Sequence, residues 1–378
     1  MIALALPALA ATAYYLIAIV AALKWLRWSK WGRRFRLPSP EGTLQLQPLS
    51  ILKPIHGRDP HFYEAIRSHA VQDYPEFEIL FGFDDSNDPA LDDVFRLQRE
   101  FPAVRIEAIV VSSETPNAKA GLLAKMAKQA RYPWLLINDS DIFVEPGYLR
   151  AVAAPLANPE VGLVTCLYRG HAESWASRME AIGVATEFAV SVMAARLLGQ
   201  AEFALGSTMA LSADTLRAAG GFEAVADYLA DDYQLGKNVS ATGRRIEFAP
   251  VVVETELGAE SLGGVWRHQV RWSRAIRVSR PGGYWGYAVT HATVWALVAF
   301  AAGQWWAGCA ALAARMIAAA LAAIALEDRY VPAALGLVPL RDLFGFAVWL
   351  AGGLGDTVYW RGHKLKLRRD GKISANAG

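Results

Sequence analysis

The first 23 residues contain no charged side chain, and this stretch constrains the fold more than any other part of the sequence. Between Met1 and Leu23 only Pro7 and Thr12 are not hydrophobic. A helix of about 20 apolar residues is long enough to cross the hydrocarbon core of a bilayer, which is roughly 30 Å thick. The sequence therefore predicts a transmembrane anchor over residues 1–26.

Basic residues follow the apolar stretch, and none precede it. A cleaved signal peptide is the alternative to an anchor, but it would carry its basic residues before the apolar run. A basic linker is predicted over residues 27–46, where the first acidic side chain is Glu41. Because positively charged flanks stay on the cytoplasmic side, the domain that follows is expected to be cytoplasmic.

A second apolar region lies in the C-terminal part of the chain. Residues 281–326 contain one formally charged side chain, Arg315, and we expect an outward and a return span joined near residues 303–308. A charge inside a span is costly and usually faces a helix bundle. Arg315 could equally anchor a tilted helix end or contact a lipid headgroup.

A third apolar stretch, residues 331–355, is interrupted by Arg341 and Asp342. The remaining pieces are short for spans, so re-entrant or interfacial helices are expected there. Residues 281–360 are thus predicted to form transmembrane or re-entrant segments. A basic tail, residues 361–378, is expected to be cytoplasmic.

The pattern between the two apolar regions is that of a globular α/β domain, predicted over residues 47–280. Short β-rich runs alternate with helical stretches, which is typical of a mostly parallel sheet with crossover helices. The predicted strands are residues 49–52, 77–83, 104–111, 134–137 and 161–166, and the predicted helices are residues 60–72, 89–101, 119–130 and 146–156.

Composition and missing motifs exclude several classes of protein. A hydrophobic content of 54% rules out disorder, and a net charge of only +2 argues against a nucleic-acid partner. Cys166 and Cys309 lie far apart, so neither a disulfide framework nor a thiolate metal site is predicted. No dinucleotide fingerprint follows the first predicted strand, and the chain contains no P-loop motif.

Acidic residues follow two of the predicted strands. Asp84 and Asp85 come after residues 77–83, and Asp139-Ser140-Asp141 comes after residues 134–137. Carboxyl ends of parallel strands meet at one edge of a sheet, where ligands bind. An Asp-x-Asp pair can accept from ribose hydroxyls and bind a divalent cation that neutralises a diphosphate. The alternative is an ordinary turn, in which Asp, Ser and Asn are common.

Two further clusters carry charge near the end of the domain. Asp231-Asp232 opens a predicted helix, where acids are also normal capping residues. Arg267, Arg271 and Arg274 lie on one helical face, and guanidinium groups match phosphate geometry. A basic amphipathic helix lying on lipid headgroups is a compatible alternative.

Residues 175–198 are apolar, but charged residues interrupt them. We expect this segment to lie at the membrane interface beside the site. A helix buried in the core is the alternative.

Taken in order, these motifs resemble the D, D, D, (Q/R)xxRW series of family-2-type membrane glycosyltransferases. The likeness is closest to the ceramide glucosyltransferases of family 21 and their bacterial relatives, which include the hopanoid-biosynthesis glycosyltransferase. It covers nearly the whole chain and includes Leu52-Lys53-Pro54, residues 161–170 and residues 203–209. One position departs from the series, because His268 stands where that family has Gln or Arg.

The resemblance implies a GT-A-type nucleotide-diphospho-sugar transferase domain with transmembrane helices at both ends. It also implies roles for individual residues. Asp232, Arg271 and Trp272 are the expected catalytic residues. Lys53, Asp85 (or its neighbour Asp84), Lys119 and Asp139 are expected to bind the nucleotide sugar, and Asp141 is the expected ligand of a divalent cation, Mg²⁺ or Mn²⁺.

The resemblance further implies an inverting transfer of a sugar from a UDP-sugar to a hydroxyl of a membrane lipid. The expected reaction is transfer of N-acetylglucosamine to a polyol hopanoid in a bacterial inner membrane, and transfer of glucose to ceramide is the alternative. A processive polysaccharide synthase is less expected, because the chain has about three C-terminal hydrophobic segments. A non-catalytic membrane scaffold is also less expected, because Asp139, Asp141, Asp232 and Arg271 are all present.

Overall fold

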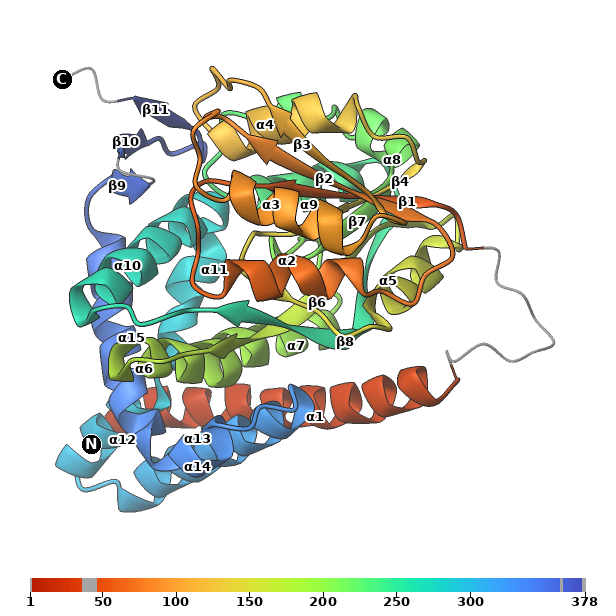
Figure 1. The fold of residues 1–378 in the computed structure, drawn as a ribbon. Helices are drawn as coiled ribbons and strands as arrows, with labels where there is room; N and C mark the ends of the chain where they lie inside the picture. The colour runs from red at the N-terminus through yellow and green to blue at the C-terminus, as the bar shows by residue number, and fades with distance from the viewer. Residues whose placement is uncertain (1, 36–45, 361–362, 376–378) are drawn as a thin grey trace.

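The computed structural model describes residues 2–35, 46–360 and 363–375. The sheet domain occupies the upper part of Figure 1, and α1, α12 and α13 run beneath it. The eight strands of the main sheet have the order β3-β2-β1-β4-β7-β6-β8-β5. A second sheet of three antiparallel strands, β11-β10-β9, lies near the C-terminus.

The structure contains every strand expected from the sequence. These are β1 (Leu49–Pro54), β2 (Phe77–Phe83), β3 (Arg105–Val110), β4 (Trp134–Ile137) and β6 (Val161–His171). β1 pairs in parallel with β2 and β4, and β2 pairs in parallel with β3. Three strands of the main sheet were not expected, β5 (Ile142–Phe143), β7 (Met209–Ser212) and β8 (Arg245–Glu256), and the antiparallel pairs formed by β5 and β7 make this sheet mixed.

The four predicted crossover helices are also present. They are α2 (Phe62–Ala70), α3 (Leu91–Glu100), α4 (Ala118–Ala127) and α5 (Tyr148–Leu156). Asn117 caps α4 by accepting a hydrogen bond from the Ala120 amide at 3.1 Å, which fixes where that helix begins. The later helices of the domain are α6 (Trp175–Gly183), the π-helix η2 (Val184–Phe188), α7 (Ala189–Leu197), α8 (Ala213–Ala218), the 3-10 helix η3 (Glu223–Val225), α9 (Asp231–Ala241) and α10 (Leu262–Ser279).

Helices cover both faces of the sheet because its strands are apolar on both sides. Ile51 and Phe81 belong to a core with residues of α2, α3 and α5. Leu52 and Leu80, one position away on the same strands, pack with residues of α4, α8 and α9 on the opposite face. Successive side chains of a strand point to opposite faces, so one apolar run supplies both cores.

The N-terminal helix is longer than expected. After the 3-10 helix η1 (Ile2–Ala5), α1 runs from Leu6 to Phe35, so residues 27–35 of the predicted linker are helical. The rest of that linker, up to residue 45, lies outside the described residues. Lys, Arg and Trp do not end a helix, so the change from apolar to basic sequence does not stop it.

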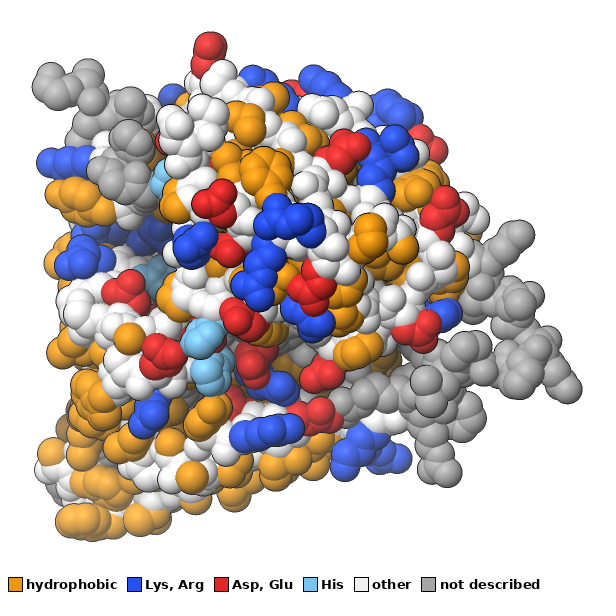
Figure 2. All heavy atoms as spheres, viewed as in Figure 1, with side chains coloured by type: hydrophobic (Ala, Val, Ile, Leu, Met, Phe, Trp, Pro, Cys, Tyr) orange, Lys and Arg blue, Asp and Glu red, His pale blue; other side chains and the backbone are white. Residues whose placement is uncertain are grey.

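Among the residues that the structure describes, three helices are long and apolar enough to cross a membrane, over Ala3–Lys30, Trp305–Ala325 and Val331–Gly353. The last two contain α13 (Trp305–Ala325) and the series α14 (Val331–Ala334), η5 (Leu335–Leu337) and α15 (Val338–Gly353). Between α10 and α13 lie α11 (Pro281–Gly286), η4 (Tyr287–Thr290) and α12 (Ala292–Ala301). Hydrophobic side chains gather along the lower left of the molecule, over α12, α13 and α14 (Figure 2).

One expectation about the C-terminal region is wrong. α12 has ten residues and is about 15 Å long, too short for the outward span expected before residue 303. Residues 331–353, where re-entrant or interfacial helices are expected, form a helical stretch that by length and composition could also cross a membrane. Its two charged residues do not break it, because both are buried against partners in the protein.

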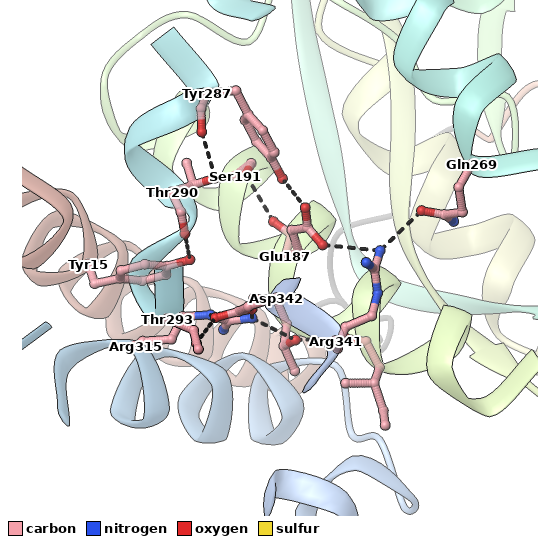
Figure 3. A network of polar contacts seen from close by, with 12 residues as sticks. Tyr15, Glu187, Ser191, Gln269, Tyr287, Thr290, Thr293, Arg315, Arg341 and Asp342 are labelled. Carbon is pink, nitrogen blue, oxygen red and sulfur yellow. Dashed lines mark hydrogen bonds and ion pairs between the residues drawn. The ribbon is translucent and has the colours of Figure 1, made fainter. Parts of the chain in front are cut away.

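Arg315 lies inside the helix bundle and is fully buried. It forms an ion pair with Asp342 of α15 at 2.7 Å (Figure 3). It also donates to the Thr186 carbonyl oxygen at 2.9 Å. Thr293 of α12 donates to the same carboxylate at 2.7 Å. A contact with a lipid headgroup, or a position at a tilted helix end, is therefore wrong for this residue.

Small residues bring the membrane helices together. Ala8 and Ala11 of α1 are buried with Ala307 and Ala311 of α13 in a cluster that consists mostly of alanine. Small side chains allow close backbone approach, which is how helices associate within lipid.

Residues 175–198 form α6, η2 and α7, and most of their apolar side chains are buried. Met179, Ile182 and Met193 belong to a cluster that also contains Trp25 of α1 and Val338 of α15. This packing agrees with the alternative of buried helices, and the position of the segment at a membrane interface stays a prediction.

The predicted basic tail is also structured. β9 (Thr357–Trp360), β10 (His363–Leu367) and β11 (Ile373–Ala375) form the small sheet. Its apolar side chains, among them Leu365 and Leu367, pack against Leu229 and Val278 of the domain. Alternation of Lys and Leu along β10 leaves the lysines exposed.

Candidate active site

Two of the predicted acids, Asp139 after β4 and Asp232 at the start of α9, converge on Gly206. A Cβ atom on Gly206 would lie 3.3 Å from Asp232 Oδ2 and 3.4 Å from Asp139 Oδ2. The Gly206 amide donates to Asp232 Oδ2 at 2.8 Å, and the Tyr233 amide donates to Asp232 Oδ1 at 2.7 Å. Glycine is needed here because a side chain would fill the space between the two carboxylates.

Lys119 on α4 supplies the positive charge of this cluster. Its ammonium group pairs with Asp139 Oδ1 at 2.5 Å. Burial alone would lower the pKa of Lys119, but the charges of Asp139 and Asp231 outweigh it and raise the pKa above its usual value. The lysine is therefore held charged beside the acids, and its alternative as a helix-start lysine facing water is wrong.

Asp141 is partly buried two residues after Asp139. Burial and the charge of Asp139 together raise the pKa of Asp141 to about 7. Thr255 of β8 donates to Asp141 Oδ2 at 2.5 Å, and Ser140 between the two acids donates to Asp59 at 2.5 Å. These contacts fix the Asp-Ser-Asp turn after β4 against the neighbouring elements.

Lys53 lies beneath this turn. Its side chain is fully buried, and it donates to the Asp139 carbonyl oxygen at 2.9 Å. Burial lowers the pKa of Lys53 to about 7, against the raising effect of Asp141 and Asp139. His69 Nε2 lies 3.5 Å from the same ammonium group. Lys53 thus supports the turn from below, whereas it was expected from the sequence to bind the nucleotide sugar.

The acids after β2 lie two strands from Asp139, because β1 separates β2 from β4. Neighbouring strands in a sheet are about 4.8 Å apart, so the acids after β2 lie about 10 Å from the Asp-Ser-Asp turn along the sheet edge. Asp85 is exposed and accepts from the Asn87 amide at 2.9 Å, whereas Asp84 lies 3.7 Å from His56. The spacing is suitable for the two ends of a nucleotide diphosphate.

Arg271 and Trp272 are half-buried on α10. Their neighbour His268 is the residue that stands where the (Q/R)xxRW series has Gln or Arg. The rings of His268 and Trp272 have centroids 4.3 Å apart. His268 Nδ1 lies 2.7 Å from Glu180, a buried carboxylate on α6. The histidine therefore makes a polar contact to the protein while packing against the tryptophan.

A chain of polar contacts links α10 to the membrane helix α15. Gln269 donates to Glu180 at 2.9 Å and accepts from Arg341 at 3.0 Å, and Arg341 pairs with Glu187 at 3.1 Å. The last part of this chain is drawn in Figure 3. The helix that carries Arg271 is thus anchored to the bundle by buried charges.

The three arginines expected on one helical face have different surroundings. Arg267 is exposed. Arg274 donates to the carbonyl oxygens of Leu354, at 3.1 Å, and Thr357. Arg274 therefore caps the end of α15 and holds the small sheet, and the idea that it shares a phosphate-binding face with Arg271 is not supported by its contacts.

The described residues contain no group of three or more His, Cys, Asp or Glu side chains that could hold a metal ion by themselves. A Mg²⁺-type site commonly uses one or two carboxylates and completes its ligands with substrate phosphates and water. The raised pKa of Asp141 indicates that a negative charge is unfavourable there without a cation. The Asp139 and Asp141 pair therefore fits a divalent ion that is bound together with a diphosphate.

Several residues of the site were missed by the sequence analysis. Gly206 lies in a motif used for the resemblance, yet nothing in the sequence assigned it a position between two acids. Thr255 and Glu180 carry no local signal, because β8 and α6 contact the site only after folding. The pKa of Tyr168 on β6 is raised mainly by burial and further by the charge of Asp232, so this tyrosine lies near the site, which the sequence did not predict.

Comparison with known proteins gives a family match over almost the full chain. The family model described as "Glycosyl transferase family 21" matches residues 6–373. Ceramide glucosyltransferase 1 of Caenorhabditis elegans is 30% identical over 200 residues, which are 52% of this chain and 42% of that protein. A ceramide glucosyltransferase of Komagataella phaffii is 34% identical over 122 residues, 31% of this chain and 23% of that protein. These matches span less than half of each relative.

A solved structure has the same fold. It is described as the mannosyltransferase PcManGT from Pyrobaculum calidifontis in complex with GDP-Man and Mn²⁺, and it superposes with a TM-score of 0.53 at 20% sequence identity. The match covers 93% of this chain and 97% of that one. At this identity the likeness concerns the fold alone, and it confirms the predicted GT-A-type domain.

Proposed function

The chain belongs to glycosyl transferase family 21, and from that premise we propose that it moves a sugar from a UDP-sugar to a hydroxyl group of a membrane lipid with inversion at the anomeric carbon. That it is a sugar-transferring enzyme follows from the family itself. The observation that carries the proposal is the convergence of Asp139 and Asp232 on Gly206 beside the charged Lys119. This cluster lies in a domain that is packed against apolar helices.

Asp232 is the proposed general base. It takes the proton of the lipid hydroxyl as that oxygen attacks the anomeric carbon, while the bond from that carbon to the UDP oxygen breaks. One displacement inverts the configuration, whereas double displacement would need a nucleophile on the other face of the sugar. The Gly206 and Tyr233 amides orient the carboxylate for this role.

The departing UDP is held by the other residues of the site. Asp139 is proposed to lie beside the ribose and diphosphate, with Asp84 or Asp85 at the uracil end. Lys119 and Arg271 stabilise the negative charge that develops on the diphosphate, and Trp272 covers it. A divalent cation, Mg²⁺ or Mn²⁺, bound at Asp141 would supply further charge stabilisation to the leaving group.

The lipid acceptor is proposed on the ceramide glucosyltransferases among the relatives and on the apolar helices. Transfer of N-acetylglucosamine to a polyol hopanoid in a bacterial inner membrane remains a prediction from the resemblance, as does the cytoplasmic position of the domain. Transfer of glucose to ceramide is the alternative, and both reactions use the same site chemistry.

A transfer assay tests the proposed function. Membranes that contain the protein are incubated with radiolabelled UDP-N-acetylglucosamine or UDP-glucose and with a polyol hopanoid or ceramide. We expect label in a lipid that carries one sugar, a loss of about tenfold or more with EDTA, and recovery with Mn²⁺ or Mg²⁺. Label found only as free sugar or as a polymer would contradict the proposal, and EDTA-insensitive transfer would contradict the metal.

The pH dependence of transfer tests the role of Asp232. Burial, together with the charge of Asp231, raises the pKa of Asp232 to about 6. A general base must be ionised, so kcat/KM should be constant above this pKa and fall about tenfold per pH unit below it. Asp231→Asn removes the repulsion and should move the acid limb to lower pH. If the acid limb of the pH profile did not move in this variant, the limb would report the titration of a group other than Asp232.

A further inference from the structure

We propose that this protein has a second ligand site, a pocket for the headgroup of an anionic phospholipid at the junction of α10, α11, the end of α15 and the small C-terminal sheet. The pocket has a volume of about 1040 Å³. That is large enough for a phospholipid headgroup, since small-molecule sites commonly enclose about 300–1,000 Å³. The proposal does not depend on the transfer reaction.

The positive charge of the pocket favours binding of an anion. Four basic side chains line it against a single acid, Asp356. Lys366 lies 3.8 Å from Asp356, and Arg368 pairs with Asp370 at 3.4 Å. Within the part of the chain that the structure describes, Arg277 and Arg369 form no ion pair with a carboxylate. Positive charge therefore exceeds negative charge where these side chains meet, which suits a phosphate group.

The position of the pocket indicates that the bound phosphate belongs to a lipid. Gly353, which lines the pocket, is the last residue of a helical stretch long and apolar enough to span a membrane. Arg277 donates to the carbonyl oxygens of Gly353 and Gly355, so a guanidinium marks the place where this stretch ends. Basic side chains at such a helix end lie at headgroup level and attract anionic lipids.

Apolar side chains beside the basic groups provide a path for acyl chains. Trp285 lines the pocket and is 56% exposed, and Leu354, which follows the pocket residue Gly353 in the sequence, is 72% exposed. Tyr359 of β9 is also exposed. Soluble phosphate would gain nothing from these side chains, whereas a phospholipid places its headgroup on the arginines and its chains on the apolar surface.

The small sheet that carries Lys366 and Arg368 also contacts the loop before α9. The Ile373 amide donates to the Asp227 carbonyl oxygen at 2.7 Å, and Lys372 donates to Asp227 Oδ2 at 3.1 Å. Asp232 follows five residues after Asp227 in the sequence. Occupation of the pocket should therefore steady residues 227–231.

Trp285 offers a direct measure of binding. The protein is placed in nanodiscs of phosphatidylcholine that contain a minor fraction of phosphatidylglycerol, with bromine on the acyl chains of one lipid or the other. The contribution of Trp285 is the difference between the wild-type protein and Trp285→Phe. We expect brominated phosphatidylglycerol to quench this contribution at least about twofold more than brominated phosphatidylcholine at the same fraction. Equal quenching by the two lipids would overturn the proposal.

A pair of variants tests the pocket itself. Lys366→Ala combined with Arg368→Ala should raise the fraction of phosphatidylglycerol needed for half-maximal quenching about tenfold. Lys364→Ala removes a lysine from the same exposed face of β10 that does not line the pocket, and it should keep most of the preference. Equal losses in the two proteins would indicate general surface attraction and would overturn the pocket.

Two further readouts separate the sources of phosphate and report the effect on the loop. An excess of inorganic phosphate should leave the preference for phosphatidylglycerol in place. If phosphate abolished this preference, the pocket would bind a soluble anion rather than a lipid headgroup. Hydrogen exchange of residues 227–231 should slow when phosphatidylglycerol replaces phosphatidylcholine. Unchanged exchange there, with lipid bound, would remove the proposed link to the loop.

Discussion

Replacing Asp232 with Asn should lower kcat for sugar transfer by about 10²–10⁴-fold. The substitution keeps the shape of the side chain but removes the group that accepts the proton of the attacking hydroxyl. The affinity for UDP should change much less, because Asp139 and Lys119 remain in place. Initial rates at saturating donor, together with UDP binding by calorimetry, measure the two effects separately.

Asp231→Asn is the matched control, since it removes the neighbouring carboxylate on the same helix. It should keep most of the transfer at neutral pH. Substantial turnover by Asp232→Asn would exclude it as the base. If both variants lost activity to the same degree, the negative charge at the start of α9 would matter rather than a proton acceptor at Asp232.

The largest expected effect on stability comes from the buried pair of Arg315 and Asp342. Asp342→Asn leaves a guanidinium that is fully buried without its carboxylate, and it weakens the hydrogen bond from Thr293. Breaking a buried ion pair from one side costs about 3–5 kcal/mol. We expect a clear fall in the unfolding midpoint in detergent micelles, measured by heat or by denaturant.

The control is the double variant Arg315→Met with Asp342→Leu. Two apolar side chains of similar size leave no unpaired charge, so much of the lost stability should return. A change below about 1 kcal/mol for Asp342→Asn would mean that water or another group satisfies the arginine. No recovery in the double variant would indicate that the loss comes from packing rather than from charge.

The parts of the fold that were predicted correctly have signals within a few residues. Residues 77–83 and 134–137 are apolar at every or nearly every position, and a strand buried on both faces needs such a run. Asp139 was placed at the sheet edge because it comes two residues after the end of β4. β7 was missed, since its four residues, Met209–Ser212, pair antiparallel with strands that are far away in the sequence.

The candidate site was predicted in part. Asp139, Asp232 and Lys119 lie close together, and Asp141 is partly buried two residues after Asp139. Lys53 lies under the turn instead, because its position in the middle of the sheet directs the side chain into the core. The sequence does not distinguish a lysine that faces a ligand from one that supports a backbone.

By itself, the sequence determined which segments are apolar enough to enter a membrane, which form the central strands, and which acids follow them. These properties depend on side chains a few positions apart, so hydrophobicity and periodicity reveal them directly. The tertiary structure decided the partners of the charges. Arg315 pairs with Asp342 within the bundle, and Arg274 donates to the Leu354 carbonyl oxygen at the end of α15. Buried charges are stable only beside a partner, and packing alone brings such partners together.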